Sequence, residues 1–261
     1  MSGYSLRGLH WFNALSAGAS VVEGLPPSLK VADAELGRFI AVVADPDNRF
    51  PRARNGEVGL LEGWGLAKAV DDAISADRDS AQKRPIIAIV DVPSQAYGRR
   101  EEALGIHQAL AGAADGYARA RLAGHPVIAL LVGKAMSGAF LAHGYQANRL
   151  IALRDPGVMV HAMGKASAAR VTLRSVEELE ALASSVPPMA YDIDSYASLG
   201  LLWETLSVQQ IEQPTEEDLT RVTECLKQAI SDVTSTDLKG RLGASNRAAS
   251  SKVRELLRAQ W

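Results

Sequence analysis

The chain has 261 residues, of which 47% are hydrophobic, and its 28 basic residues stand against 30 acidic ones. This length is enough to bury a large core and lies near the upper end of what one domain contains. Because the formal net charge is only −2 at pH 7, the composition gives no reason to expect nucleic acid or an anionic membrane as a partner. Cys225 is the single cysteine, which excludes an internal disulfide framework and a cysteine-based structural zinc site and fits a reducing cytoplasm.

The histidines and the first residues carry no metal-binding or targeting pattern. None of the five histidines has the spacing of a His-Glu-x-x-His site, so we expect no bound metal. The N-terminal segment lacks the charged and then apolar pattern of a signal peptide. No apolar run approaches the roughly 20 residues that a membrane span needs. These features predict a soluble, cytoplasmic protein.

Four short apolar runs are typical of buried strands. They span residues 39–43, 85–90, 127–132 and 150–153. Alanine-rich segments with apolar residues at helical spacing predict helices over residues 65–76, 101–122 and 138–147. Strands and helices that alternate in this way predict an α/β fold with parallel strands, arranged as successive ββα or βα layers.

The C-terminal part of the chain has a different character. Residues 214–218 place negative charge at a helix start, and apolar residues then recur at helical spacing. Residues 231–246 are rich in Ser, Thr, Asp and Gly and predict a mobile polar connector. We expect the short amphipathic tail that follows to pack on the body or on another subunit, because isolated helices below about 12–15 residues are marginal in water. The predicted organisation is a main domain with an N-terminal extension over residues 1–230, and a polar connector with a short C-terminal helix over residues 231–261.

Residues 133–139 read Gly-Lys-Ala-Met-Ser-Gly-Ala and predict a tight turn between a buried strand and a helix start. The first amides of a helix have no partner within it, and the lack of bulk at Ser137, Gly138 and Ala139 lets a ligand oxygen approach them. This pattern is typical of an oxyanion hole built from the main chain. The alternative is a tight loop whose small residues allow close packing of helix on strand.

Polar side chains at the mouths of the two central strands are candidates for the walls of the same cleft. Segment 91–102 follows one of these strands, and from it we select Gln95 and Tyr97 as substrate-binding residues. Gln146 is selected from the segment after the other strand. The alternative for segment 91–102 is a solvated connecting loop.

Nucleophilic catalysis and histidine catalysis are both disfavoured. A Gly-x-Ser-x-Gly elbow needs glycine where Ala135 and Ala139 stand, so Ser137 is assigned a positioning role. His143 and His161 are candidate acid or base groups. However, a single histidine in an apolar context is more often a hydrogen-bonded packing residue.

Several segments together resemble a known family. Residues 85–93, the glutamates at 101–102 and the stretch 125–144 with its Ser-Gly-Ala turn resemble the α-type half of the acetyl-CoA carboxylase carboxyltransferases, which belong to the crotonase superfamily. The longer pattern resembles more closely the γ subunit of biotin-independent malonate decarboxylases. It includes His-Trp-Phe at 10–12, Arg-x-Gly-Glu-Val-Gly at 54–59 and Val-His-Ala-Met-Gly-Lys at 160–165.

The resemblance implies a crotonase fold of stacked ββα layers with flanking helices, and a heterodimer with a β subunit of the same fold. That family decarboxylates a malonyl thioester on an acyl carrier protein to an acetyl thioester and CO2, and works with an acyl-transferase α subunit. The resemblance implies no directly bound cofactor, because the phosphoribosyl-dephospho-CoA prosthetic group is attached to the carrier protein. It also implies that a hole on the β subunit holds the thioester oxygen, while the amides of Gly138 and Ala139 hold an oxygen of the departing carboxylate.

Two departures from the related carboxyltransferases are visible in the sequence. Those relatives carry Ser-Gly-Gly where this chain has Ser-Gly-Ala at 137–139, but alanine keeps the amide N–H that the chemistry uses. They also carry a Ser-Pro-Glu-Gly turn where residues 161–164 read His-Ala-Met-Gly, so the carboxylate of that turn is missing. The alternatives left open are a carboxyltransferase component of a biotin-dependent acyl-CoA carboxylase or decarboxylase, a stand-alone crotonase, and a scaffold subunit without catalysis.

Overall fold

One eight-stranded sheet lies at the centre of the computed structural model, which describes residues 3–242 and 244–261. The strand order is β1-β2-β3-β4-β5-β6-β8, and β7 pairs with β5 beyond the end of β6. The strands are β1 (Ser20–Val21), β2 (Leu29–Ala34), β3 (Gly37–Val42), β4 (Ile86–Val92), β5 (Val127–Met136), β6 (Arg149–Leu153), β7 (Met159–His161) and β8 (Glu204–Leu206).

The central strands are parallel and buried, as their apolar sequences predict. The pairs from β3 through β6 to β8 are parallel, whereas β1, β2 and β3 pair antiparallel. Every residue of β3 and β4 is buried. The predicted α/β fold is confirmed, with the four apolar runs as β3, β4, β5 and β6.

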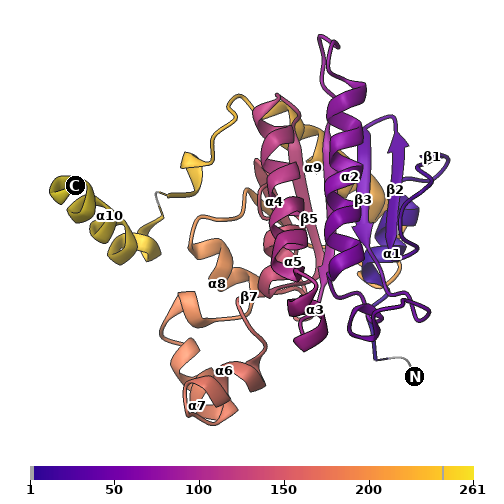
Figure 1. Cartoon of the computed structure of the whole chain (residues 1–261). Helices are drawn as coiled ribbons and strands as arrows, with labels where there is room; N and C mark the ends of the chain where they lie inside the picture. Colours follow the sequence, from indigo (N-terminus) through magenta and orange to yellow (C-terminus); the bar gives the residue numbers. More distant parts are fainter. Residues whose placement is uncertain (1–2, 243) are drawn as a thin grey trace.

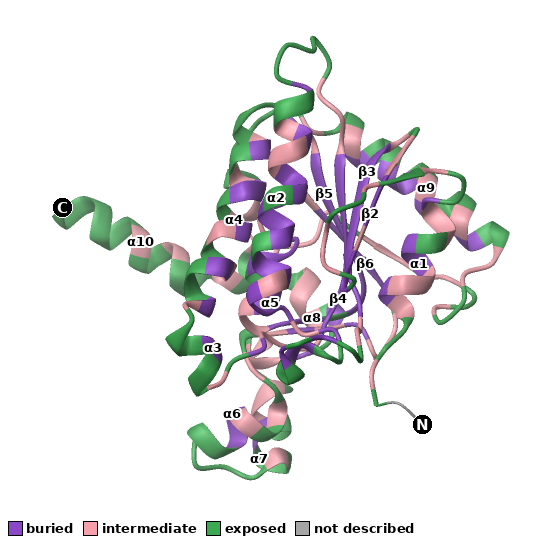
Figure 2. Ribbon diagram, turned by 45° about the vertical axis from the view of Figure 1, so that its right-hand side comes forward, coloured by how far each residue is buried: buried purple, intermediate pink, exposed green. Residues whose placement is uncertain are grey.

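Helices cover both faces of the sheet. Helices α2 (Leu60–Ala76) and α4 (Ile106–Leu122) pack together on one face, and α1 (Arg7–Leu15) and α9 (Glu216–Ser231) lie on the other (Figures 1 and 2). The helix that the acidic segment 214–218 predicts is α9, whose N-cap Thr215 accepts the amide of Asp218. Between the helical layers, the buried residues of the sheet form the main core (Figure 2).

Two of the predicted helix boundaries are wrong for reasons that are local. Helix α2 begins at Leu60 rather than at residue 65, because the buried Glu62 side chain reaches back to the amide of Gly59 (2.9 Å) and so caps the helix start. The predicted helix 101–122 is two helices, α3 (Arg99–Ala103) and α4. Gly105 separates them with φ +83°, a left-handed conformation that interrupts a helix.

The predicted turn at 133–139 is also shorter than expected. Strand β5 continues through Gly133 to Met136, because residues 134–136 pair with β7. The helix that follows, α5 (Ser137–Ala142), ends before the predicted residue 147. Gly144 stops it with φ +104°, and a side chain at that position would come within 2.8 Å of Val90.

A group of short helices extends from one end of the sheet. It contains α6 (Lys165–Val171), α7 (Val176–Ala183), α8 (Ile193–Ser198) and the 3-10 turn η2 (Pro187–Met189); a further such turn, η1 (Pro51–Ala53), precedes α2. This group has a small core of its own, formed by Met136, Ala168, Leu179 and Tyr191. Met136 belongs to β5, so the small core fastens these helices to the end of the central strand.

The C-terminal connector, predicted as a polar segment, contacts the body of the molecule. Arg149 pairs with Asp232 at 2.5 Å, and Arg241 donates to the carbonyls of Tyr145 (2.8 Å) and Ala147. The connector includes the 3-10 turns η3 (Lys239–Leu242) and η4 (Ser245–Arg247). These contacts satisfy carbonyl groups in the loop after α5, which have no strand or helix partner.

The last helix, α10 (Ala248–Gln260), extends away from the rest of the molecule (Figure 1). No residue of α10 is buried, and its apolar residues Val253, Leu256 and Leu257 are each more than half exposed. Its sequence is amphipathic, but the body does not cover its apolar face. None of the helices described is both long and apolar enough to cross a membrane.

Candidate active site

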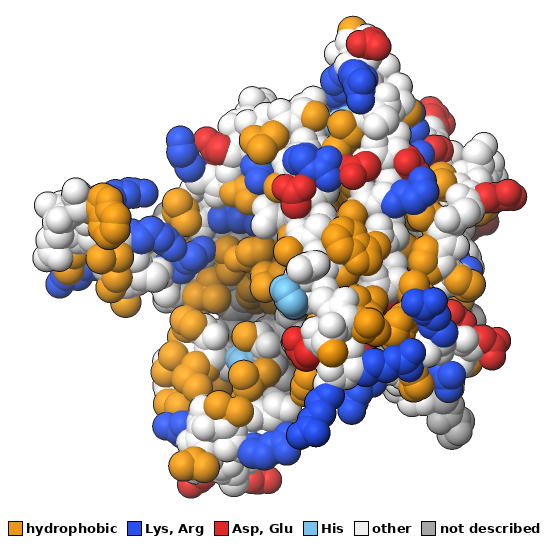
Figure 3. Space-filling model, in the orientation of Figure 1, with side chains coloured by type: hydrophobic (Ala, Val, Ile, Leu, Met, Phe, Trp, Pro, Cys, Tyr) orange, Lys and Arg blue, Asp and Glu red, His pale blue; other side chains and the backbone are white. Residues whose placement is uncertain are grey.

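An apolar groove of about 350 Å³ opens beside the start of α5. Its walls come from α5, the end of β7, η2 and α8. It is lined by Ser137, Gly138, Phe140, Leu141, Tyr145, Val160, His161, Ala162, Pro187, Pro188, Ala190, Tyr196, Leu199 and Leu201. Figure 3 shows hydrophobic side chains gathered in a hollow between α10 and the body of the molecule. Two of the three predicted catalytic residues, Ser137 and Gly138, therefore lie on the wall of a groove.

Ser137 has a backbone conformation that is uncommon for a residue with a side chain. Its φ is +57°, in the left-handed region. Such a conformation costs on the order of 1–3 kcal/mol and persists only where the surrounding structure holds it. Here Met136 is fixed by pairing with His161 in β7, and α5 begins at Ser137 itself. The strained residue is thus the point at which strand β5 changes into helix α5.

The predicted residues Gln95 and Gly138 are in direct contact. The amide of Gly138 donates to Oε1 of Gln95 at 3.0 Å. Because a backbone N–H needs an acceptor, it is the oxygen of the carboxamide that faces Gly138. Gln95 is held in place by backbone bonds on either side, since Ala96 donates to the carbonyl of Val58 (2.9 Å) and Val58 donates to that of Ser94 (3.1 Å).

The two predicted amide donors are not both open to the surface. Ala139 is completely buried, so no part of it faces the groove. Gly138 is partly exposed, but its amide is already bonded to Gln95. Of the two predicted donors, only the amide of Gly138 lies at the groove, and the side chain of Gln95 covers it.

Tyr97 and Gln146 do not line the groove. Tyr97 follows Gln95 closely in the chain, but its side chain lies on the surface and is 54% exposed. Gln146 faces Arg121, which donates to its backbone carbonyl at 3.2 Å and lies 3.5 Å from its Oε1. The loop after α5 instead contributes the neighbouring Tyr145 to the groove wall.

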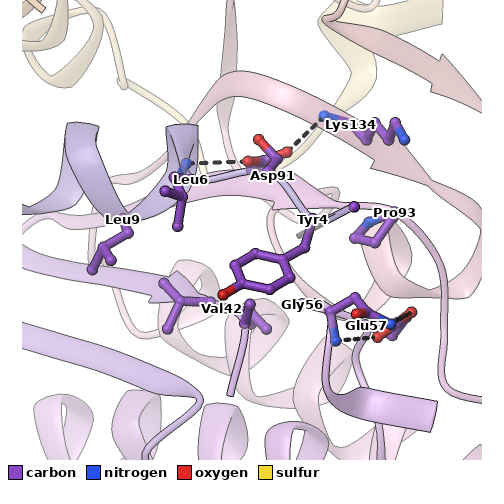
Figure 4. A pocket seen from close by; sticks show the side chains of 15 residues that line it. Tyr4, Leu6, Leu9, Val42, Gly56, Glu57, Asp91, Pro93 and Lys134 are labelled. Atoms are coloured by element: carbon purple, nitrogen blue, oxygen red, sulfur yellow. Dashed lines mark hydrogen bonds between the residues drawn. The ribbon is translucent and has the colours of Figure 1, made fainter. Parts of the chain in front are cut away.

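A second cavity, of about 340 Å³, lies beside α1 at the carboxyl ends of β3 and β4. Figure 4 shows Tyr4 inside it, with the buried carboxylate of Asp91 above. Asp91 accepts the amides of Gly8 and Lys134, both at 3.1 Å, and so ties α1 to β5. A side-chain carbon at Gly133 would lie 2.0 Å from Oδ1 of Asp91. The glycine therefore makes room for Asp91 and not for a ligand.

His143 is a packing residue, as predicted. It is fully buried, its Nε2–H donates to the carbonyl of Ile89 at 2.9 Å, and its Nδ1 accepts from the hydroxyl of Tyr117 at 3.0 Å. The bond from Tyr117 needs the neutral ring, because an acceptor nitrogen cannot carry a proton. Burial lowers the pKa of His143 to about 4.

His161, the other candidate acid or base, lines the groove. Its ring stacks on Tyr191 with the centroids 3.9 Å apart. The preference for a packing role came from its apolar neighbours. A usable signal was its position directly after Val160, at the end of a short strand.

Comparisons with known proteins identify the family. The sequence profile of the malonate decarboxylase gamma subunit, MdcE, matches residues 53–261. The chain belongs to this family. A structure of a Pseudomonas malonate decarboxylase hetero-tetramer in complex with coenzyme A contains a chain that is 73% identical. The alignment covers 98% of the present MdcE-family chain and 99% of the Pseudomonas chain, with a TM-score of 0.94.

Two further relatives extend the comparison. A chain in the structure of the Pseudomonas malonate decarboxylase MdcD-MdcE hetero-dimer is 69% identical, with a TM-score of 0.90 and coverage of 98% and 99%. The malonyl-S-ACP:biotin-protein carboxyltransferase MADD of Malonomonas rubra is 36% identical over 182 residues, or 67% of this MdcE-family chain. The chain spans 62% of the length of MADD.

More distant structures support the fold alone. Transcarboxylase 12S shares 19% identity with the chain over 88% of its length, with a TM-score of 0.62 and 42% of the transcarboxylase chain covered. This likeness confirms the crotonase-like carboxyltransferase fold that the resemblance implied.

Proposed function

We propose that this MdcE-family chain forms one half of a malonyl-thioester decarboxylase site and that an MdcD-type subunit of the same fold supplies the other half. Membership of the gamma subunit family and the crystallised MdcD-MdcE hetero-dimer of a relative support the pairing. The observation that carries the proposal is the amide of Gly138 at the wall of an apolar groove. The products are an acetyl thioester and CO2.

The carboxamide oxygen of Gln95 marks the place of a substrate oxygen. It is an acceptor held 3.0 Å from the amide of Gly138. A malonyl carboxylate is a stronger acceptor than a neutral carboxamide, because hydrogen bonds to a charged group are roughly twice as strong. The carboxylate therefore displaces Gln95 and takes the amide. Ala139, although buried, adds to the partial positive charge at the start of α5.

The apolar walls of the groove favour loss of the carboxylate charge. Among the described lining residues there is no Asp, Glu, Lys or Arg. Breaking the bond between the α-carbon and the carboxylate releases neutral CO2 and moves the electron pair into the thioester as an enolate. The enolate oxygen needs its own donors, which we assign to the hole of the MdcD-type subunit. Loss of one such donor typically costs about 3–4 kcal/mol of transition-state stabilisation.

Further partners follow from the family. We infer that the malonyl group arrives on an acyl carrier protein whose prosthetic arm is a phosphoribosyl-dephospho-CoA, and that an acyl-transferase α subunit loads it. The coenzyme A bound to the Pseudomonas hetero-tetramer supports a thioester arm of this chemistry. No cofactor bound directly by this chain is required. A cytoplasmic location suits this set of partners.

Biotin carboxyltransfer is the second candidate, and the name of MADD favours it. Transfer of the carboxyl group to biotin and its release as CO2 begin with the same bond cleavage. MADD is 36% identical, whereas the chain from the malonate decarboxylase hetero-tetramer is 73% identical over nearly the whole length. The decarboxylase is therefore the function that we propose. A scaffold subunit without catalysis is the third reading.

Reconstitution decides among the three. The chain is combined with its MdcD-type partner, the carrier protein and the acyl-transferase, and malonate-dependent CO2 release is measured with and without biotin. Release without biotin supports the decarboxylase. Carboxyl transfer that needs biotin supports the second candidate. If Gly138→Pro and His161→Asn both assemble and turn over like the wild type, the scaffold reading is supported.

A further inference from the structure

His161 is the one histidine on the described groove wall, which contains no Asp, Glu, Lys or Arg. The other titratable side chains there are Tyr145 and Tyr196. The hydroxyl of Tyr196 is buried without a hydrogen-bond partner among the described residues, and burial raises its pKa. Among the described residues of this chain that line the groove, the imidazole is therefore the candidate proton donor.

The ring of His161 is held in one orientation. It stacks on Tyr191 with an interplanar angle of 13°. Its Nδ1 lies 2.9 Å from the carbonyl oxygen and 3.2 Å from the amide nitrogen of Met163. That carbonyl also accepts the hydroxyl of Tyr191 at 2.8 Å, which fixes the backbone that holds the ring. With Nδ1 engaged in this way, Nε2 is the atom that is left for a ligand.

Pairing within the sheet places His161 next to the strained turn. His161 is the register partner of Met136, the residue before Ser137. Ser137, Gly138 and His161 all line the groove. An acyl group whose carboxylate is bound at Gly138 therefore enters the space that the imidazole borders.

We propose that His161 donates a proton to the α-carbon of the enolate after CO2 has left. The proposal rests on the proposed function and assigns a catalytic residue to it. The bond from the α-carbon to the carboxylate breaks, the electron pair enters the enolate, and a C–H bond then forms with the proton from Nε2 of the imidazolium. The neutral imidazole regains its proton from water, so that each turnover consumes one proton from solvent.

The charge of the substrate controls when His161 carries the proton. In the free chain, burial lowers the pKa of His161 below its ordinary value of 6.5, so the ring is neutral at pH 7. A bound malonyl carboxylate is an opposite charge that favours the imidazolium. When CO2 leaves, the negative charge moves from the carboxylate to the enolate. Transfer of the proton from the imidazolium then neutralises both charges, which the apolar groove favours.

Other charged groups near the ring do not take this role. The ammonium of Lys165 lies 5.5 Å from the centre of the Tyr191 ring and pairs with Glu180 at 2.7 Å. Tyr191, packed on the ring, has its pKa raised by burial and its hydroxyl bonded to Met163. The residues of β5 that pair with β7 beside His161 are Ala135 and Met136, which do not titrate.

The test measures the return of CO2 as well as turnover. The complete complex, with either the wild-type chain or the His161→Asn variant, is given malonate in the presence of 13C-labelled CO2. The exchange ratio is the amount of label that enters the malonyl thioester divided by the amount of acetyl thioester formed. An enolate that is protonated slowly recaptures CO2. We expect turnover to fall roughly 100-fold, the range of a lost general acid, while the exchange ratio rises at least about tenfold. His107→Asn, an exposed change on α4, is the control.

Each outcome separates one idea from the other. An exchange ratio that stays at the wild-type value while turnover falls overturns proton donation and leaves the proposed function intact. A wild-type complex that releases no CO2 overturns both. The melting temperature of each complex is measured, and His161→Gly with added imidazole serves as a second variant. Partial recovery of turnover together with a falling exchange ratio supports proton donation, and no response to imidazole counts against it.

Discussion

The carboxamide of Gln95 and the amide of Gly138 form a closed pair, 3.0 Å apart, at the wall of the apolar groove. Gln95 comes from the segment after β4 and Gly138 from the start of α5, so the pair joins the two central βα units at one point. If a substrate carboxylate takes the place of Gln95, the strength of this bond sets how easily the site opens.

Changing the charge at Gln95 tests whether its side chain and a substrate carboxylate compete for the amide of Gly138. Gln95→Glu places a carboxylate against the Gly138 amide, which strengthens the bond and repels a malonyl carboxylate. We expect KM for the malonyl carrier to rise at least about tenfold, equal to roughly 1.4 kcal/mol. Gln95→Ala uncovers the amide and should lower KM or leave it unchanged. Steady-state kinetics of the reconstituted complex give both values, and a KM that rises equally in the two variants contradicts the competition.

Removing the amide itself is the complementary experiment. Gly138→Pro deletes the N–H group, whereas Gly138→Ala keeps it. An added Cβ at this position meets its nearest atoms at 3.5 Å, an ordinary contact, so the alanine variant is a fair control. We expect Gly138→Pro to lower kcat by about 100- to 1000-fold and Gly138→Ala to change it little. Size-exclusion chromatography checks that both variants still assemble; equal loss in both would point to a steric effect.

The sheet was predictable because its central strands are short apolar runs, rich in β-branched residues, that alternate with helical patterns. The boundaries around the site were not, because they depend on contacts between distant segments. In the sequence, Gly133 fits a turn that approaches a ligand. In the structure, it makes room for Asp91 of the neighbouring strand. Gly144 ends α5 because it packs close to Val90, a contact that no local pattern reveals.

The candidate site was predictable only in part, because it too depends on contacts between distant segments. Gln95 and Gly138 were both selected, but their mutual bond depends on the parallel pairing of β4 and β5. Gln146 was selected for polarity alone, and Arg121 from α4 holds it. His161 ends β7, a position that draws attention to it, but the groove depends on η2 and α8, which lie further along the chain.

The clash that Gly133 avoids leads to a prediction on stability. Gly133→Ala forces a methyl group into the space of the Asp91 carboxylate, only 2.0 Å from Oδ1. Overpacking of this kind costs typically about 1–3 kcal/mol. Gly164→Ala is the matched control, because nothing lies within 4 Å of a side chain there. Chemical denaturation of the two variants should show a lower free energy of unfolding for Gly133→Ala alone. Equal values would mean that Asp91 moves aside without cost.

His143 predicts the direction in which pH changes stability. Its folded-state pKa of about 4 lies below its ordinary value of 6.5, so the unfolded chain binds the proton more readily. The stabilisation is complete above pH 6.5 and is lost as the pH falls towards 4. His143→Gln should remove part of this loss, and should also destabilise the protein at pH 7 by about 1–3 kcal/mol through the unpaired Tyr117 hydroxyl or Ile89 carbonyl. Urea unfolding at pH 7.5 and 5 measures both effects, and an unchanged pH dependence in the variant would assign it to other groups.

The uncovered face of α10 predicts where the partner subunit binds. Its apolar side chains are exposed and the body offers them no cover, whereas a free helix of 13 residues is marginal in water. Burying a leucine contributes about 1.5–3 kcal/mol, so Leu256→Ser and Leu257→Ser should each weaken binding of the MdcD-type partner by roughly tenfold or more. Lys252→Ser, on the same helix, is the control. Because no residue of α10 is buried in the chain alone, the melting temperature of the isolated chain should be the same for all three variants. Titration calorimetry with the partner gives the affinities, and leucine variants that bind like Lys252→Ser would place α10 outside the interface.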